Sequence, residues 1–325
     1  MDLLQEAEQW RQRARLQEYW EPAIDKIGRD LDLACRSVQG DFNSNNAVFT
    51  LDRRYIVKLY APDQRASAGV EEEALRLLAA NSGLSVPPLL GVGELAGPLA
   101  CPYIVMGLIP GQPLDRLRGR LSAGERIDIA GQLGRAMALF HRTPISAQAP
   151  IRRAQGGWDS LCQARRRQLY ADLDRLDGWP ARLLTQLRAF AVSPQVDAYL
   201  REPQVLVHGD LTCYHVYARQ RAGRWRIAGL IDLGNALMAP PEYEWVDLWL
   251  QTFERDVRAA RAFFQAYQPG LVIDENYRRR LLAVFLHSWE AIPQLLAHLK
   301  AERAPVMENM QQLLDWLWPP QLAAI

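Results

Sequence analysis

The chain has 325 residues, of which 49% are hydrophobic and 23% charged, and its formal net charge is +1. This length suggests two domains, and the composition excludes a disordered or collagen-like chain. The balanced charge gives no long-range attraction to nucleic acid or to an anionic membrane. We therefore expect a globular protein with ample buried core and with neither of those polyanionic partners.

The cysteines and the N-terminus indicate where the protein works. The four cysteines lie far apart and form no CxxC pair, so they predict neither a zinc site nor a disulfide framework. No apolar run approaches the ~18 residues of a membrane span. The amphipathic start lacks the basic and apolar regions of a signal peptide. We expect reduced, buried thiols and a cytoplasmic location.

The first third of the chain predicts a helix, two strands, a second helix and further strands. Residues 2–20 have helical spacing of their apolar side chains. Residues 47–60 predict two short strands joined by a polar turn. A helix is expected over 69–83, and strands over 86–95 and 102–109. These elements indicate a small, sheet-rich N-terminal lobe.

The remainder is mainly helical, with one group of strands. Ser122 and Glu125 form a capping-box start for a helix over 126–142. Short strands are expected at 204–210, 214–219 and 224–232. Further helices are predicted at 158–177, 180–191, 243–267, 275–299 and 303–317. The Ile109–Gly111 junction is the best boundary, which gives an N-terminal lobe of 1–108 and a C-terminal lobe of 109–325.

The strongest chemical signal lies at two strand ends in the C-terminal half. An apolar strand leads into His208-Gly209-Asp210, and His215 follows five residues after Asp210. A second apolar strand leads to Asp232 in a glycine-containing turn. Phosphoryl transfer needs such a set. One carboxylate positions and deprotonates the attacking hydroxyl, while the other and a neutral ligand hold magnesium on the nucleotide phosphates.

This arrangement closely resembles the aminoglycoside phosphotransferase family, relatives of the protein kinases. The shared signature is a His-Gly-Asp loop, a metal ligand five residues on, and a downstream Ile-Asp-x-Gly, here ending at Gly234. The resemblance covers roughly residues 38–300 and implies an α+β, two-lobed protein-kinase-like fold. It implies that Asp210 is the catalytic base and that His215 and Asp232 bind magnesium. The family usually has Asn in place of His215, whereas macrolide phosphotransferases carry His.

Lys58 is one of only three lysines in an arginine-rich chain. In the strand YIVKLY it shares a face with Ile56 and Tyr60, which is expected to be the inner face. An inward lysine needs a partner. In a kinase-like lobe that partner is the nucleotide's α- and β-phosphates together with a helix glutamate.

The partner glutamate is one of three in succession, Glu71, Glu72 and Glu73. The positions three, four and seven residues after Glu71 are all apolar, so Glu71 fits an inward helix face best. Glu72 and Glu73 are expected to be solvated.

Two further segments complete the expected nucleotide site. The loop before residue 47 is polar and lacks the GxGxxG pattern, and Asn43 and Ser44 are its candidate phosphate contacts. At the lobe junction, the resemblance implies that Met106 closes the back of the adenine pocket. Gly107 and Ile109 would supply a backbone carbonyl and amide to the base.

The sequence thus predicts a Mg²⁺-dependent enzyme that moves the γ-phosphate of ATP or GTP to a hydroxyl of a small molecule. The acceptor is expected to be an aminoglycoside, a macrolide or another antibiotic, or a sugar-like metabolite. Acidic and basic side chains are mixed in the C-terminal helices, where Trp245, Trp249 and Trp289 are candidates for lining a substrate cleft. This mixture does not select a cationic substrate. A protein Ser/Thr kinase and a non-catalytic nucleotide-binding module remain as alternatives.

Overall fold

The computed structural model describes residues 10, 12–13, 16–33, 36–41, 46–80, 83–96, 101–176, 178–201, 203–288, 291–302 and 304–323. The chain forms two compact units. The first comprises Met1–Pro113 and His215–Ala236, and the second comprises Leu114–Tyr214 and Leu237–Ile325. The functional division into lobes of 1–108 and 109–325 stays a prediction.

The first unit is built on a five-stranded antiparallel sheet with strand order β1-β2-β3-β5-β4. The strands are β1 (Val38–Asp41), β2 (Ala47–Leu51), β3 (Tyr55–Leu59), β4 (Leu89–Leu95) and β5 (Cys101–Gly107). The two strands expected within 47–60 and those expected within 86–95 and 102–109 are confirmed, whereas β1 was not predicted.

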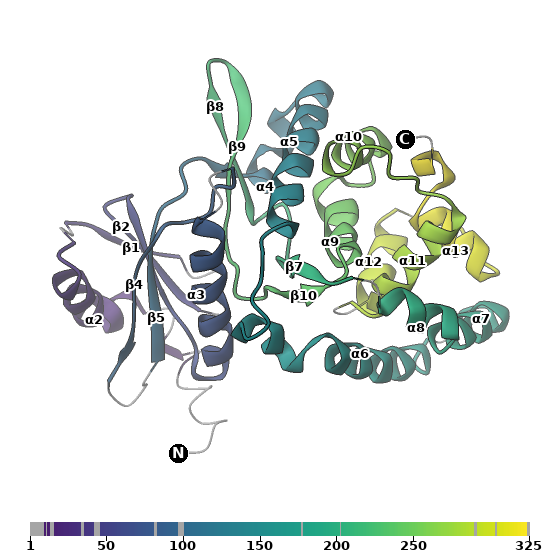
Figure 1. Ribbon diagram of the computed structural model, residues 1–325, viewed down its shortest axis with the longest axis horizontal. Helices are drawn as coiled ribbons and strands as arrows, with labels where there is room; N and C mark the ends of the chain where they lie inside the picture. Colours follow the sequence, from purple (N-terminus) through teal and green to yellow (C-terminus); the bar gives the residue numbers. More distant parts are fainter. Residues whose placement is uncertain are drawn as a thin grey trace. The chain divides into compact units, whose positions relative to one another are not determined.

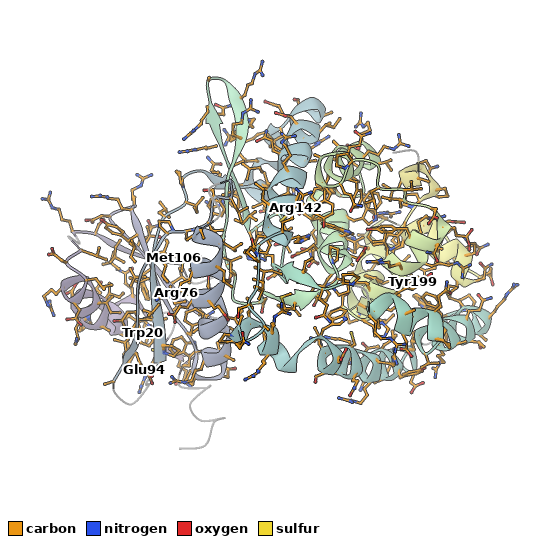
Figure 2. The ribbon with its side chains drawn as sticks, viewed as in Figure 1. Trp20, Arg76, Glu94, Met106, Arg142 and Tyr199 are labelled. Carbon is orange, nitrogen blue, oxygen red and sulfur yellow. The ribbon has the colours of Figure 1, made fainter. Side chains whose placement is uncertain are left out.

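Two helices cover opposite sides of this sheet (Figure 1). Helix α2 (Gln17–Asp30) packs Trp20 and Ile24 against Phe49 and Val57 in the hydrophobic core, and Trp20 is labelled in Figure 2. Most of the helix predicted over 2–20 lies outside the described residues. The prediction is wrong at Leu16, whose backbone is extended and precedes the start of α2, and α2 continues to Asp30. Helix α3 (Arg65–Ala79) contacts β4 and β5.

The same unit contains a second, three-stranded sheet from distant parts of the chain. Its strands are β6 (Gln112–Pro113), β8 (Val216–Arg221) and β9 (Arg224–Leu230), in the order β6-β8-β9. The predicted pair of strands is confirmed. Gln112 pairs with Ala218, so the segment just after Ile109–Gly111 is joined to the strands that lead to the Ile-Asp-x-Gly segment.

The second unit is mainly helical. Its α-helices are α4 (Leu114–Leu117), α5 (Ala123–His141), α6 (Trp158–Leu173), α7 (Ala181–Ala191), α8 (Pro194–Leu200), α9 (Glu242–Asp247), α10 (Val257–Tyr267), α11 (Glu275–Leu286), α12 (Ala291–Ala301) and α13 (Met310–Leu317). β7 (Val205–Val207) and β10 (Leu237–Ala239) form a two-stranded sheet, and β7 leads directly into the His-Gly-Asp loop. The capping box is confirmed, because the Glu125 amide donates to the Ser122 hydroxyl and the Ser122 amide donates to the Glu125 carboxylate.

Two predicted long helices are wrong because each is interrupted. The expected helix over 243–267 becomes α9, a π-helix over Leu248–Thr252, and α10. Glu254 and Arg255 have φ of +48° and +61°, which breaks the helix, and the Asp256 side chain then caps α10. The expected helix over 275–299 is divided into α11 and α12. No helix in the described ranges is both long and apolar enough to cross a membrane.

Candidate functional site

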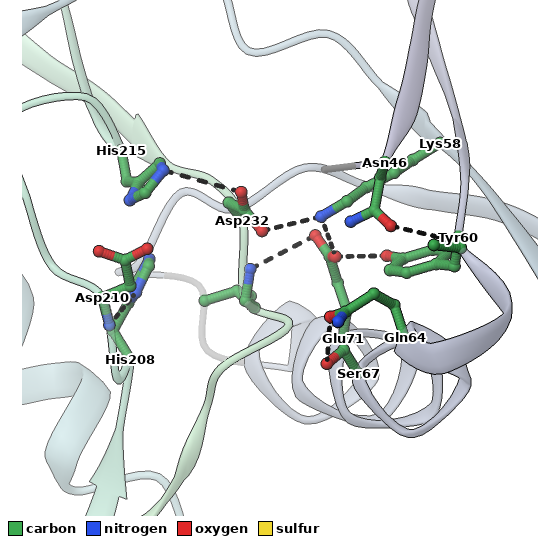
Figure 3. Close-up of polar contacts among 12 residues, drawn as sticks. Asn46, Lys58, Tyr60, Gln64, Ser67, Glu71, His208, Asp210, His215 and Asp232 are labelled. Atoms are coloured by element: carbon green, nitrogen blue, oxygen red, sulfur yellow. Dashed lines mark hydrogen bonds and ion pairs between the residues drawn. The ribbon is translucent and has the colours of Figure 1, made fainter. Parts of the chain in front are cut away.

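Lys58 lies on β3 and is buried, with about 6% of its surface exposed. Its Nζ donates hydrogen bonds to Glu71 Oε2 at 2.7 Å and to Asp232 Oδ1 at 2.8 Å (Figure 3). Burial is the largest influence and by itself lowers the pKa of Lys58. The charges of Glu71 and Asp232 and their hydrogen bonds outweigh it, so the pKa lies above that of an ordinary lysine. The site therefore holds a permanent positive charge at a fixed place.

Glu71 is the centre of this network. Besides Lys58, its carboxylate accepts a hydrogen bond from the Tyr60 hydroxyl and one from the Leu233 amide at 3.3 Å. Burial, followed by the charge of Glu71, raises the pKa of Tyr60 well above its usual value, so the hydroxyl remains a donor. The neighbouring Glu72 instead pairs with Arg76 at 2.9 Å on the outer side of α3. Of the three consecutive glutamates, Glu71 is therefore the one that pairs with Lys58.

Asp232 and His215 approach each other beside the lysine. Asp232 Oδ2 lies 3.7 Å from His215 Nε2, while the other carboxylate oxygen accepts from Lys58. Asp232 has φ of +63°, an unusual conformation for a residue other than glycine, and this strain places its carboxylate at the end of β9. No group of three or more potential metal-binding side chains occurs among the described residues. A magnesium ion at this pair would therefore also need ligands from a nucleotide and water.

The His-Gly-Asp loop follows β7 in the second unit. Gly209 has φ of +81°, a conformation that glycine adopts without steric cost. The Asp210 amide donates to His208 Nδ1 at 3.3 Å, and the His208 ring is fully buried. The buried His208 ring therefore fixes the loop through the Asp210 amide. Asp210 itself is partly exposed.

Glu244, on α9, supports the same loop from the protein interior. Its Oε1 accepts a hydrogen bond from the His208 amide, and the residue is about 1% exposed. Burial, opposed by the hydrogen bond from the His208 amide and assisted by the nearby charge of Asp247, raises the pKa of Glu244 to about 8. Its Oε2 has no hydrogen-bond partner in the described part of the molecule. At neutral pH a carboxyl in this position is mainly protonated.

The remaining predicted residues are placed as follows. Met106 is buried on β5 and shares the Lys58 face of the sheet, because it pairs with Ile56 (Figure 2). The Gly107 amide donates to the Pro88 carbonyl at 2.9 Å, and Ile109 is buried. Asn43 and Ser44 lie outside the described residues.

The tryptophans proposed to line a substrate cleft are core residues. Trp245 makes an edge contact with Phe263, and Trp249 stacks on Trp318. Both are nearly fully buried, so the structure gives them packing roles. Trp289 lies outside the described residues.

A comparison with models of protein families shows which family the chain belongs to. The model of the phosphotransferase enzyme family matches residues 34–283. The chain belongs to this family. No curated protein matches this chain significantly. The family match confirms the predicted resemblance and the predicted enzyme class.

Solved structures with the same fold are aminoglycoside phosphotransferases. A variant of aminoglycoside 2'-phosphotransferase-IIIa in complex with GDP is 20% identical, with a TM-score of 0.64 over 91% of this chain and 96% of that one. A ternary complex of streptomycin, ATP and APH(2")-IIa is 16% identical, with a TM-score of 0.61 over 90% and 97%. APH(3'')-Id from Streptomyces rimosus, in complex with ADP and streptomycin, is 20% identical, with a TM-score of 0.58 over 83% and 99%. These similarities confirm the predicted protein-kinase-like fold.

Three groups that hold this polar cluster were given no role in it from the sequence alone. Tyr60 stands two residues after Lys58, and alternation along a strand is a usable signal that both side chains point the same way. The Leu233 amide gives no sequence signal, because any residue offers one. The contact of Glu244 with His208 has no local sequence signal, because it joins residues 36 positions apart in the chain.

Proposed function

We propose that this phosphotransferase transfers the γ-phosphate of ATP or GTP, with Mg²⁺, to a hydroxyl of a small molecule. The observation that carries the proposal is the buried Lys58, held by Glu71 and Asp232 in a member of this family. Such a lysine is a fixed cation for nucleotide phosphates, and Glu71 keeps it in place. Tyr60 and the Leu233 amide in turn hold Glu71.

Asp232 and His215 are the residues proposed to hold the metal. The carboxylate of Asp232 suits magnesium, which prefers oxygen ligands and usually retains waters and phosphate oxygens. A neutral imidazole nitrogen at His215 is compatible with a metal ligand. When bound, the ion neutralises negative charge on the β- and γ-phosphates. Binding there requires the Asp232 carboxylate to be shared between the metal and Lys58, or released from Lys58.

Asp210 is proposed to position the acceptor hydroxyl and to accept its proton. The buried His208 and the left-handed Gly209 fix the loop that presents this carboxylate. Met106, Gly107 and Ile109 are proposed to contact the base, and Asn43 and Ser44 the phosphates. The segment 1–108 would then be the nucleotide-binding lobe, and 109–325 would be the lobe that carries the catalytic residues and binds the acceptor.

The acceptor is proposed to be an antibiotic, either an aminoglycoside or a macrolide, or a sugar-like metabolite. Structural neighbours bind streptomycin, which supports a hydroxyl-rich acceptor. Several acidic side chains of the second unit are already neutralised by arginine. These pairs are Glu242 with Arg280, Glu254 with Arg118, and Asp256 with Arg258. This pairing supports testing neutral acceptors as well as polycationic ones.

The test is phosphate transfer from ATP and from GTP, with magnesium, to a panel of aminoglycosides, macrolides and simple sugars. Asp210→Ala is expected to lower turnover by roughly 10³-fold or more while nucleotide binding, followed by thermal shift, persists. Asp159→Ala, at an exposed position in the same unit, is the matched control and should keep native turnover. Near-native turnover of Asp210→Ala on a phosphorylated acceptor would show that Asp210 is not the base.

A further inference from the structure

The hairpin of β8 and β9 in the first unit is strongly basic. Between Asp210 and Asp232 the chain has no acidic residue but four arginines, all of which lie on these two strands. The strands are labelled in Figure 1 and are joined only by Ala222 and Gly223, which have φ of +48° and +73°. Positive φ at both positions is typical of a tight type I′ turn, so the arginines extend to the tip of the hairpin.

All four arginines lie on one face of this two-stranded ribbon. In the antiparallel register Arg219 is opposite Arg226, and Arg221 is opposite Arg224. Because side chains alternate along a strand, positions two residues apart share a face, and directly opposite positions do as well. Trp225 lies between two of these arginines, points to the other face and is buried. That other face packs against the protein, whereas Arg221 and Arg224 are exposed.

The positive charge of this face is not neutralised by neighbouring carboxylates. Among the residues that the structure describes, the side chains of Arg219, Arg221 and Arg224 have neither a hydrogen bond nor an ion pair. Arg226 donates to the Trp225 carbonyl at 3.4 Å. Like charges directly opposite one another destabilise a pair of strands, so a negatively charged partner would relieve this repulsion. The net charge of +1 does not reveal the cluster, because it is a sum over the whole chain.

The shape and chemistry of the ribbon favour double-stranded DNA among polyanions. A guanidinium group can donate two parallel hydrogen bonds to phosphate oxygens. The major groove of B-form DNA is about 12 Å wide and admits a two-stranded β-ribbon. Proteins that bind single strands stack the bases on accessible aromatic rings, whereas Trp225 is buried. The tip residues Ala222 and Gly223 offer no large apolar side chain for insertion into a membrane.

We propose that the arginine face of the β8–β9 hairpin binds the phosphate backbone of double-stranded DNA without sequence preference. Arg219, Arg221 and Arg224 pair with phosphates, and contacts to phosphates alone carry no sequence information. This inference does not depend on phosphotransfer, because none of these arginines is among the residues proposed for the chemistry. It differs from the expectation drawn from net charge, since attraction of a polyanion depends on the local cluster of charge.

The experiment measures binding of the full-length, untagged protein to a fluorescein-labelled DNA duplex of ~20 base pairs by fluorescence anisotropy, in a series of NaCl concentrations. We expect saturable binding. The logarithm of the association constant should fall with the logarithm of the salt concentration with a slope of about −2.7, which is −0.9 for each of the three unpaired arginines. Between ~50 and ~200 mM NaCl the affinity should therefore fall roughly 40-fold.

Two double variants test whether the hairpin makes the contact. Arg221→Gln combined with Arg224→Gln removes two phosphate contacts and should reduce the slope to about −0.9. Arg65→Gln combined with Arg76→Gln is the matched control. It removes the same formal charge from exposed arginines of the same unit that are already paired with carboxylates, at 2.8 Å and 2.9 Å. The control should keep the native slope and affinity, and thermal unfolding confirms that both double variants fold.

Several outcomes would overturn the proposal. They are no saturable binding at ~50 mM NaCl, a native slope in the hairpin variant, and equal weakening by the two double variants, which would show that net charge and not the hairpin is responsible. Competition identifies the class of partner. Unlabelled duplex should displace the probe most effectively. Stronger displacement by polyglutamate, by a single strand of the same sequence or by phosphatidylserine vesicles, compared at equal charge, would also overturn the assignment to double-stranded DNA.

Discussion

Glu71 in the first unit and Glu244 in the second are both about 1% exposed, yet the two carboxyl groups have different surroundings. Glu71 accepts from the Lys58 ammonium and the Tyr60 hydroxyl, and Lys58 also reaches Asp232. Glu244 accepts from a backbone amide, and Asp247 is the neighbouring charge that raises its pKa. The first cluster buries a charged network, whereas the second buries a carboxyl that holds its proton to about pH 8.

The difference shows how burial and charge are combined in one enzyme. Removing a charge from water is costly, and an opposite charge at hydrogen-bond distance offsets much of that cost. At the proposed phosphate site the charge is required, so the chain supplies two carboxylates to one lysine. Behind the His-Gly-Asp loop the Glu244 carboxyl has no opposite charge beside it among the described residues, and its neutral form is sufficient to accept from the His208 amide.

The largest expected effect concerns the pH dependence of stability through Glu244. The folded pKa of about 8 exceeds the ordinary value near 4.3, so the folded protein binds a proton that the unfolded chain has lost. The contribution of this proton to the free energy of unfolding is fully present below pH ~4.3. It declines as the pH rises to about 8 and is then constant. Glu244→Gln lacks this decline, so its free energy of unfolding relative to the native protein should rise by roughly 4 kcal/mol between pH 4.5 and pH 9.

Urea unfolding at a series of pH values measures this difference. Glu275→Gln, on the exposed start of α11, is the control and should follow the native curve. Parallel curves for the native protein and Glu244→Gln would show that Glu244 is ionised in the folded state, and the contrast with Glu71 would disappear.

Lys58→Met is the next largest change. It leaves Glu71 and Asp232 without their cation and should lower the free energy of unfolding by about 3 kcal/mol. Lys26→Met removes one partner of an exposed pair with Asp30 and should cost about 0.5 kcal/mol or less. Adding Glu71→Gln to Lys58→Met is expected to restore part of the loss. Similar costs for the two lysines, measured by urea unfolding, would contradict the buried-network interpretation.

The smallest expected effect is the difference between two glycines, Gly209 of the His-Gly-Asp loop and Gly234 of the Ile-Asp-x-Gly segment. Gly209 has φ of +81°, so Gly209→Ala should cost about 1–2 kcal/mol. A Cβ at Gly234 would meet its nearest atoms, Glu71 Oε2 and Ser67, at 3.5 Å and 3.6 Å, which is ordinary contact. Gly234→Ala should therefore change the stability by less than 1 kcal/mol. Equal destabilisation by the two substitutions in urea unfolding would show that the left-handed turn is not what Gly209 supplies.

Local pattern was sufficient for several elements of the fold. Alternation over 47–60 gave both strands of a hairpin, and Ser122 with Glu125 gave the start of α5. The inward face of α3 could be predicted because the positions after Glu71 repeat with helical spacing. The break after the π-helix was not predictable in this way, because apolar residues continue through it with nearly helical spacing.

By itself the sequence determined the family, the order of most strands and helices, and the residues proposed for chemistry. Those properties follow from short-range periodicity and from motifs that are contiguous in the chain. The tertiary structure decided that Lys58 contacts Asp232, 174 residues away, and that the Glu244 carboxyl accepts from the His208 amide. It also decided that the Glu244 carboxyl keeps its proton at neutral pH, because a pKa depends on burial and on neighbours that only folding brings together.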